Sequence, residues 1–429
     1  MRWTRYSAAL LTAAGVYHLR RAWSSAITTD EAFTANAFVA PPWLDLLTSY
    51  DANHHILHSF LCKLSVTAFG WNELALRLPS LLGGFVWLYL AYRLAKRLFG
   101  DSPLHLVLCG WLAFHPSLLD WFSLARGYGL ALTFMLAAVY ELAGPLPTLG
   151  RASLWLGLSA AANLVFAVPA AALVIGWTAA RGAWRRLPDL AVPGATAALV
   201  VTIIPLSRAE GTSFYYGADN LLYSIDSLFG LPGFDGLSAA LIIAAPAVLL
   251  AALWHGRRDE TLRFFAWSLT LCILALAAMR IGGMPYPLGR TGVYIVALWI
   301  LCLLQLASLS PIHWTWAAVL APVAAFLFVA PTGYYRPWQY DAGNRAVMER
   351  IAASGVAPPT IAAPGILIQG LEFYRRNPGF NHWPAIAEAK EGVQTQFVIL
   401  RTDESPGPPP PGMAPIWRDP VSGIVLYGR

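Results

Sequence analysis

The stretch that decides the fold lies between residues 28 and 80, and it reads TTDEAF at 28–33, YDANHH at 50–55 and RLPS at 77–80. This stretch is polar, whereas the segments before and after it are strongly apolar. Two adjacent acids, a third acid and a histidine pair therefore fall in one loop that directly follows an apolar segment. We expect this loop to lie at a membrane surface and to carry the active site.

The composition is that of an integral membrane protein. Of the 429 residues, 57% are hydrophobic and 12% are charged, and the mean hydropathy is +0.54, whereas soluble domains carry about 25% charged residues. The net charge of +6 does not indicate a nucleic-acid partner, because Lys and Arg lie in short loops where they orient helices in a membrane. The four cysteines stand apart in apolar segments without CxxC spacing, so they predict no cysteine metal site or disulfide framework.

Apolar windows of about 20 residues predict about 11 transmembrane helices. A signal peptide is the alternative for the first of them, but we expect a retained helix. The run at 152–180 is interpreted as two short spans hinged near Asn163 to Pro169. Residues 54–69 are interpreted as an interfacial helix, because they are short and interrupted by His and Lys. The remaining spans are expected at residues 6–27, 77–98, 103–119, 127–143, 189–206, 237–254, 263–280, 291–309 and 314–330.

The basic loops orient this array. Clusters of Arg and Lys near residues 93–97, 181–186 and 255–263 are expected on the cytoplasmic side. The N-terminus is then cytoplasmic, and the protein lies in a plasma membrane, for which we expect a bacterial inner membrane. The loops at 28–76, 119–127, 207–236 and 281–290, together with the tail after 331, then lie outside the cytoplasm.

The chain divides by composition into a membrane domain at 1–331, which includes the first external loop at 28–76, and a tail at 332–429. Helical spacing in the tail predicts helices at 344–353 and 366–376, and short apolar runs predict strands at 396–400 and 423–427. We therefore expect a small extracytoplasmic α/β domain. It has no phosphate loop and no triad signature.

Asp30 and Glu31 are the candidate catalytic residues. A carboxylate close to the head group of an amphiphile can accept the proton of an acceptor hydroxyl as an anomeric carbon is attacked. Asp30 is the first candidate for this base and Glu31 the second, while plain solvation of a loop is the alternative for either acid.

The segment after residue 50 has three interpretations. His54 and His58 are four residues apart and share a helix face, so Asp30, Asp51, His54 and His58 form one candidate site for a divalent metal. The histidines are alternatively polar groups of an interfacial helix. A third interpretation, preferred over the metal, is that His55 binds a phosphate and that Asp51 and His54 bind substrate.

Two further loops supply arginines on the expected external side. Asp120 and Arg126 flank the loop before Tyr128, and Arg290 follows a proline-stiffened turn. A guanidinium binds a lipid phosphate through two parallel hydrogen bonds and is always charged. We expect Arg126 and Arg290 to bind a phosphate and Asp120 and Tyr128 to bind substrate, with simple interface anchoring as the alternative for both arginines.

These motifs together resemble those of the GT-C integral-membrane glycosyltransferases, and more narrowly the protein-mannosyltransferase and aminoarabinose-transferase branch (glycosyltransferase family 39-like). The matching elements are Asp30-Glu31, the segment NHHIL at 53–57, GWNELALRLPS at 70–80 and ARGY at 125–128. The resemblance is strongest over residues 1–140. The chain departs from the branch at His54-His55, where relatives often carry a proline pair.

The resemblance implies an inverting transfer of a hexosyl or pentosyl group from a polyprenyl-phosphate donor to a lipid, glycan or protein acceptor outside the cytoplasm. Asp30 would be the base, and Arg126 and Arg290 would contact the donor phosphate. A divalent metal stays an open alternative. The competing hypothesis is a polytopic transporter or lipid flippase, but such proteins gather ionisable residues near the bilayer midplane, whereas here they gather in external loops.

Overall fold

The structure is a computed structural model, and it describes residues 2–210, 216–231, 235–309, 326, 333–390, 394–402 and 411–428. The chain forms two compact units. Unit 1 comprises residues 1–19, 47–58 and 79–330, and unit 2 comprises residues 20–46, 59–78 and 331–429. Each unit is therefore assembled from three separate parts of the chain. The span expected at 314–330 lies outside the described residues, apart from residue 326.

Unit 1 is helical. Its elements are α1 (Arg2–Ser24, whose end belongs to unit 2), α5 (Glu73–Phe99, whose start belongs to unit 2), α6 (Pro103–Phe114), α7 (Pro116–Leu119), η2 (Asp120–Phe122), α8 (Gly127–Leu142), α9 (Leu149–Ala162), η3 (Leu164–Phe166), α10 (Ala167–Arg181), η4 (Trp184–Arg186), α11 (Leu187–Leu206), α12 (Leu221–Phe229), α13 (Asp235–His255), α14 (Glu260–Ile281), η6 (Gly289–Gly292) and α15 (Val293–Ser308).

The apolar runs fold into helices much as expected, but the count of about 11 spans is not confirmed. Among the described residues, six helices are long and apolar enough to cross a membrane. A seventh is added if α7–η2 and α8, which are bent by 107°, form one broken span. The expected hinge in the run at 152–180 is present at Asn163, which separates α9 from α10.

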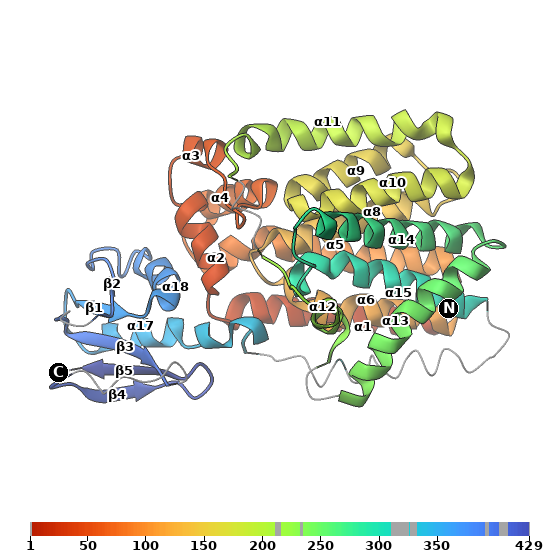
Figure 1. The fold of residues 1–429 in the computed structure, drawn as a ribbon. Helices are drawn as coiled ribbons and strands as arrows, with labels where there is room; N and C mark the ends of the chain where they lie inside the picture. Colours follow the sequence, from red (N-terminus) through yellow and green to blue (C-terminus); the bar gives the residue numbers. More distant parts are fainter. Residues whose placement is uncertain are drawn as a thin grey trace. The chain divides into compact units, whose positions relative to one another are not determined.

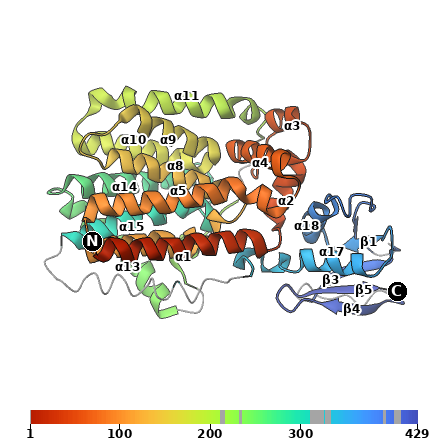
Figure 2. The ribbon, with the colours of Figure 1, turned by 180° about the vertical axis from the view of Figure 1, so that it is seen from behind.

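Packing within unit 1 brings several helices into parallel layers. Helix α9 packs between α8 and α11, and α10 packs against α14 (Figure 1). On the other side of the unit, α1 lies along α5, where Gly15 faces Phe85 (Figure 2). Several helices therefore begin or end at the same end of the bundle, which is where polar side chains can gather.

Unit 2 contains the first polar loop and the tail. Its helices are α2 (Thr29–Thr34), the π-helix η1 (Ala35–Val39), most of α3 (Trp43–Thr48), most of α4 (Ile56–Phe69), η7 (Arg336–Asp341), α17 (Asn344–Ala353) and α18 (Gly365–Arg375). Helix α4 is the short apolar helix expected at the interface. Helix α18 packs against both α2 and α17.

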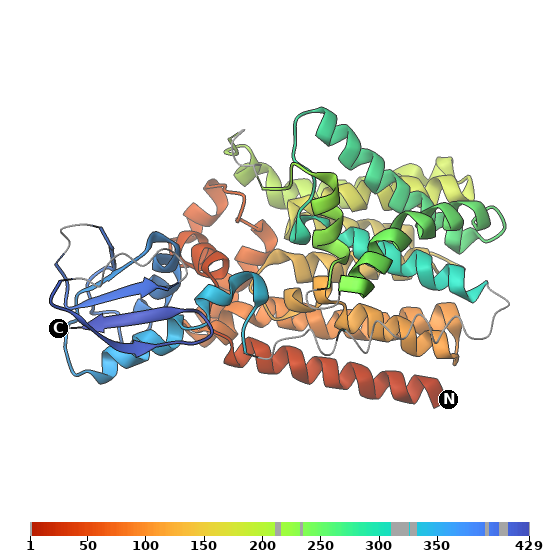
Figure 3. The same cartoon turned by 60° about the horizontal axis from the view of Figure 1, so that its bottom comes forward.

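The tail forms the expected α/β domain with a five-stranded sheet (Figure 3). Its strands are β1 (Ile361–Ala363), β2 (Ala387–Glu388), β3 (Phe397–Arg401), β4 (Ala414–Arg418) and β5 (Ile424–Gly428), in the order β2-β1-β3-β5-β4. Strand β1 is parallel to β2 and β3, while β3, β5 and β4 are antiparallel neighbours. The two expected helices and the strands β3 and β5 are confirmed.

Candidate functional site

Helix α2 of unit 2 carries the two candidate catalytic acids, and its first turn is fixed by a capping box. The Thr28 backbone N–H donates to Glu31 Oε2 over 3.0 Å, and the Glu31 N–H donates to Thr28 Oγ1 over 3.3 Å. This reciprocal pair satisfies two of the backbone donors that every helix start leaves open. The sequence Thr-x-x-Glu therefore places Glu31 on the inner side of the turn, where its side chain is fully buried.

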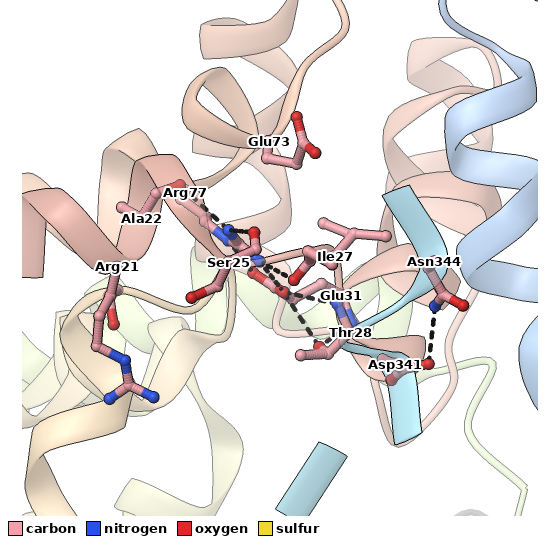
Figure 4. Close-up of polar contacts among 12 residues, drawn as sticks. Arg21, Ala22, Ser25, Ile27, Thr28, Glu31, Glu73, Arg77, Asp341 and Asn344 are labelled. Carbon is pink, nitrogen blue, oxygen red and sulfur yellow. Dashed lines mark hydrogen bonds and ion pairs between the residues drawn. The ribbon is translucent and has the colours of Figure 1, made fainter. Parts of the chain in front are cut away.

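A buried ion pair joins Glu31 to Arg77 (Figure 4). Arg77 Nε donates to Glu31 Oε1 over 2.8 Å, and Nη2 donates to Glu31 Oε2 over 2.7 Å. The other guanidinium N–H groups donate to the carbonyl oxygens of Ala22, Ser25 and Ala26. Arg77 thus uses all five of its donors, and the pair ties the end of α1 to α2 and α5.

A second carboxylate holds the start of α2. Asp341, at the end of η7, accepts from the Thr29 backbone N–H over 2.6 Å and from Thr29 Oγ1 over 2.8 Å. Asn344 Nδ2 donates to the same carboxylate over 2.9 Å (Figure 4). Burial, with a smaller contribution from Asp30, raises the pKa of Asp341 to about 7, although the bonds from Thr29 and Asn344 oppose the shift.

Asp30 differs from its neighbour. It is half-buried, whereas Glu31 is fully buried. The helix thus sets the two adjacent acids in different surroundings, because consecutive residues of a helix lie about 100° apart around its axis. Asp30 is the acid of the pair that retains access to solvent, and Glu31 is engaged in the ion pair.

Unit 1 contains a cavity of about 360 Å³ at the end of the helix bundle. Its wall is built from the segment before α4, the starts of α8, α10 and α15, the end of α14 and the break between α9 and α10. The lining residues are Tyr50, Ala52, Asn53, His54, His55, Arg126, Tyr128, Asn163, Leu164, Val165, Ala167, Val168, Tyr216, Leu276, Met279, Met284, Pro285, Pro287, Arg290, Thr291 and Tyr294.

Two arginines give this cavity a positive charge. Arg126 Nη2 donates to Asn53 Oδ1 over 2.8 Å. The guanidinium carbon of Arg290 lies 4.0 Å from the ring centre of Tyr216. Both arginines line the cavity, so an anion within it would lie near two cations.

The two histidines of the cavity are neutral at physiological pH. Burial lowers the pKa of His54 to about 4, despite the hydrogen bond to the Ser49 carbonyl. Burial also lowers the pKa of His55, and Arg126 and Arg290 lower it further. The neutral His54 donates its single N–H, on Nδ1, to the Ser49 carbonyl oxygen, so its Nε2 is an acceptor. The neutral His55 can offer one N–H donor next to the arginines.

Buried polar atoms of the cavity-lining residues include His55 Nε2, Asn163 Nδ2 and Tyr294 Oη, which have no hydrogen-bond partner within the part of the chain that the structure describes. A buried polar group left in this state costs about 1–3 kcal/mol. Natural proteins hold few such groups, and those that occur call for an explanation. Here all three belong to residues that line one cavity, an arrangement that suits a binding site for a polar ligand.

Gly127 allows the wall to close around His55. A Cβ atom at this position would lie 2.1 Å from the Ala162 carbonyl oxygen and 2.7 Å from His55 Cβ. Only glycine therefore permits this approach between the start of α8, the end of α9 and the histidine. The neighbouring Tyr128 packs its ring edge-on against His55, with 5.1 Å between the ring centres.

Five predicted site residues meet in the cavity, namely His54, His55, Arg126, Tyr128 and Arg290. Asp51 and Asp120 are not among its lining residues. Asp51 instead accepts from the Asn53 backbone N–H over 2.8 Å and so shapes the turn before the histidines. His58 Nε2 lies 2.8 Å from Ser80 Oγ. Among the described residues, no group of three or more His, Cys, Asp or Glu side chains is arranged to hold a metal ion.

Sequence reasoning did not identify Asn163 and Tyr294 as residues of the site. Asn163 stood out only as part of a hinge, and a tyrosine near a helix start resembles any interfacial aromatic residue. The only sequence signal for Tyr294 is its position four residues after Arg290.

Comparisons with protein-family models and with curated proteins find no match. Among solved structures, the chain is similar to the crystal structure of ArnT from Cupriavidus metallidurans bound to undecaprenyl phosphate, with a TM-score of 0.60 and 15% identity. The same protein in its apo state gives a TM-score of 0.59. Each alignment covers 98% of this chain and 97% of that chain. The protein is therefore an integral membrane protein with an ArnT-like fold, in agreement with the fold that the resemblance in its first 140 residues implied.

Proposed function

We propose that the protein is a membrane glycosyltransferase that moves a sugar from a polyprenyl-phosphate donor to an acceptor hydroxyl outside the cytoplasm. The observation that carries this proposal is the mixed character of the cavity. Arg126, Arg290 and His55 supply charge and N–H donors, whereas much of the remaining wall is apolar, including Leu276 and Met279. A phosphate bound to a hydrocarbon chain needs such a combination.

The fold supports the same donor. In the solved ArnT complex the bound molecule is undecaprenyl phosphate, and we extend that class of ligand to this chain. The arginines bind the phosphate through charge-assisted hydrogen bonds. As the sugar leaves, the phosphate oxygen gains negative charge, and the fixed guanidinium groups stabilise that charge without reorganisation.

The reaction that we propose is a direct displacement. The acceptor oxygen attacks the anomeric carbon, and the bond from that carbon to the phosphate oxygen breaks with its electron pair on the phosphate. The configuration at the anomeric carbon inverts. The proton of the acceptor hydroxyl passes to the carboxylate of Asp30, so the products are the glycosylated acceptor and polyprenyl phosphate.

We assign the base to Asp30 and a positioning role to Glu31. Glu31 is fully buried and bound by Arg77 through both of its oxygens, so using it as a base would require breaking that pair. Asp30 is half-buried and sits on a helix whose start is held by the capping box and by Asp341. A base that is held in place and open to solvent suits the reaction.

The first test is transfer activity in nanodiscs with a panel of polyprenyl-phosphate sugars, comparing the wild type with Asp30→Asn. General-base catalysis contributes about 10²- to 10⁴-fold, so turnover should fall by that factor while donor binding persists. The matched control is Asp189→Asn, at an acid that is exposed and paired with Arg186. Wild-type turnover in Asp30→Asn would exclude Asp30 as the base.

Two further arms separate this function from its alternatives. A chelator added to the wild type tests the divalent metal. A wild type that binds polyprenyl phosphate and turns over no sugar donor would instead favour a transporter or lipid flippase.

Single cysteines at residues 30 and 184, labelled from outside, test the topology, because we place residue 30 outside and residue 184 in the cytoplasm.

A further inference from the structure

Two uncharged groups of the cavity have no role in the reaction described above. Asn163 lies at the break between α9 and α10, and Tyr294 lies in the first turn of α15. Their side chains are almost completely buried, with exposed fractions of 2% and 0%. Both line the cavity that contains Arg126 and Arg290.

The amide of Asn163 is oriented by the protein itself. Its Oδ1 accepts from the Val165 backbone N–H over 3.1 Å and so caps η3. This bond fixes the amide plane and directs Nδ2, which carries two donor hydrogens, away from the helix cap. Within the described chain, Nδ2 has no partner.

Tyr294 is held by packing. Its ring lies 5.7 Å from that of Phe166 in an edge-on arrangement, and its hydroxyl has no partner among the described residues. A phenol hydroxyl both donates and accepts one or more hydrogen bonds. Neither Asn163 nor Tyr294 carries a charge, so their pairing suits a neutral ligand group that contains hydroxyls.

We propose that Asn163 and Tyr294 form a subsite for the sugar of the donor, next to the arginines that bind its phosphate. This inference rests on the proposed function and assigns the two parts of one ligand to two kinds of side chain. Guanidinium groups match the charged phosphate, whereas an amide N–H₂ and a phenol hydroxyl match sugar hydroxyls. The two groups should therefore distinguish a sugar-bearing lipid from the bare lipid phosphate.

The test compares two ligands in the full-length protein in nanodiscs: undecaprenyl phosphate, and undecaprenyl phosphate that carries a hexose, a pentose or an aminopentose. Tyr294→Phe removes only the hydroxyl. Asn163→Ser removes the amide donors and keeps an oxygen that can cap η3. Each variant should weaken binding of the preferred sugar-bearing donor about three- to tenfold, the size of one lost hydrogen bond, and leave binding of the bare lipid phosphate unchanged.

Equal loss for both ligands in Tyr294→Phe, or no loss for either, would overturn the subsite. A wild type that binds the bare and the sugar-bearing lipid equally well would overturn the subsite and leave the proposed function standing. A wild type that binds neither lipid would overturn both. If Asn163→Ser does not fold, Tyr294→Phe decides alone, since the loss of one hydroxyl preserves the shape of the ring.

Discussion

The ion pair in unit 2 and the cavity in unit 1 are both buried and both rich in polar groups, but they use these groups in opposite ways. All five N–H groups of the Arg77 guanidinium donate hydrogen bonds, two to Glu31 and three to carbonyl oxygens. On the cavity wall, His55, Asn163 and Tyr294 each keep a buried polar atom without a partner in the described chain. The first arrangement links parts of the folded chain, whereas the second leaves polar groups that, in our proposal, bind a ligand.

The largest effect should come from breaking the ion pair between Arg77 and Glu31. Arg77→Met leaves Glu31 buried without its counter-charge, and the loss of one partner from such a pair costs about 3–5 kcal/mol. We expect a strong drop in the apparent melting temperature and in the yield of folded protein. Measurement by thermal denaturation in detergent, with ligand binding followed in parallel, checks this.

The double variant Glu31→Gln with Arg77→Met is the control, because it removes both charges together. It should recover part of the lost stability, since no unpaired charge is left. If Arg77→Met were as stable as the wild type, the ion pair between Arg77 and Glu31 would not stabilise the folded chain.

A change in the cavity should instead affect binding and leave folding largely intact. Arg126→Ala removes a charge-assisted bond of about 1.5–3 kcal/mol, so polyprenyl phosphate should bind about 10- to 100-fold more weakly. The apparent melting temperature of Arg126→Ala should stay close to that of the wild type. The matched control is Arg151→Ala, at an exposed arginine paired with Glu141 outside the cavity lining. If Arg126→Ala unfolds, the prediction that this change affects binding and not folding is wrong.

The last effect appears only as a dependence of stability on pH, and it is expected at Asp341 of unit 2. Its pKa rises from 3.8 to about 7 on folding, mainly through burial. Between these values the folded chain keeps a proton that the unfolded chain has lost, so the stability contributed by this proton falls as the pH rises. The slope is at most about 1.4 kcal/mol per pH unit. Asp341→Asn should flatten the dependence of the melting temperature between pH 5 and pH 7.

Sequence reasoning predicted the architecture well because its signals were long. Apolar runs, a polar first loop and the tail's periodic segments identified most helices and the α/β domain. The strands that were missed lie at or near the edges of the sheet. Strand β2 has only two residues, and β4 contains Pro415, which an edge strand tolerates because it has an unpaired side. Patterns this short or interrupted are indistinguishable from loop.

The site was predicted in part. The sequence grouped the arginines and histidines and ranked Asp30 ahead of Glu31 as the base. It could not predict that Glu31 is bound by Arg77, because that ion pair forms between residues 46 positions apart. It also gave Asp120 a place among the substrate-binding residues, whereas the cavity lining does not include it. Asn163 and Tyr294 carry no local motif, since their environment is created by segments far apart in the chain.

The contact at Gly127 has a consequence for engineering. Because a single added methyl group at this position would collide with the Ala162 carbonyl and with His55, the cavity cannot be reshaped from that side without displacing the backbone of α8 or α9. Under the proposed function, a library that seeks variants for bulkier or smaller lipid donors should hold residue 127 constant. It should place its diversity at the apolar positions Val168, Leu276 and Met279, where side-chain volume alone sets the available space.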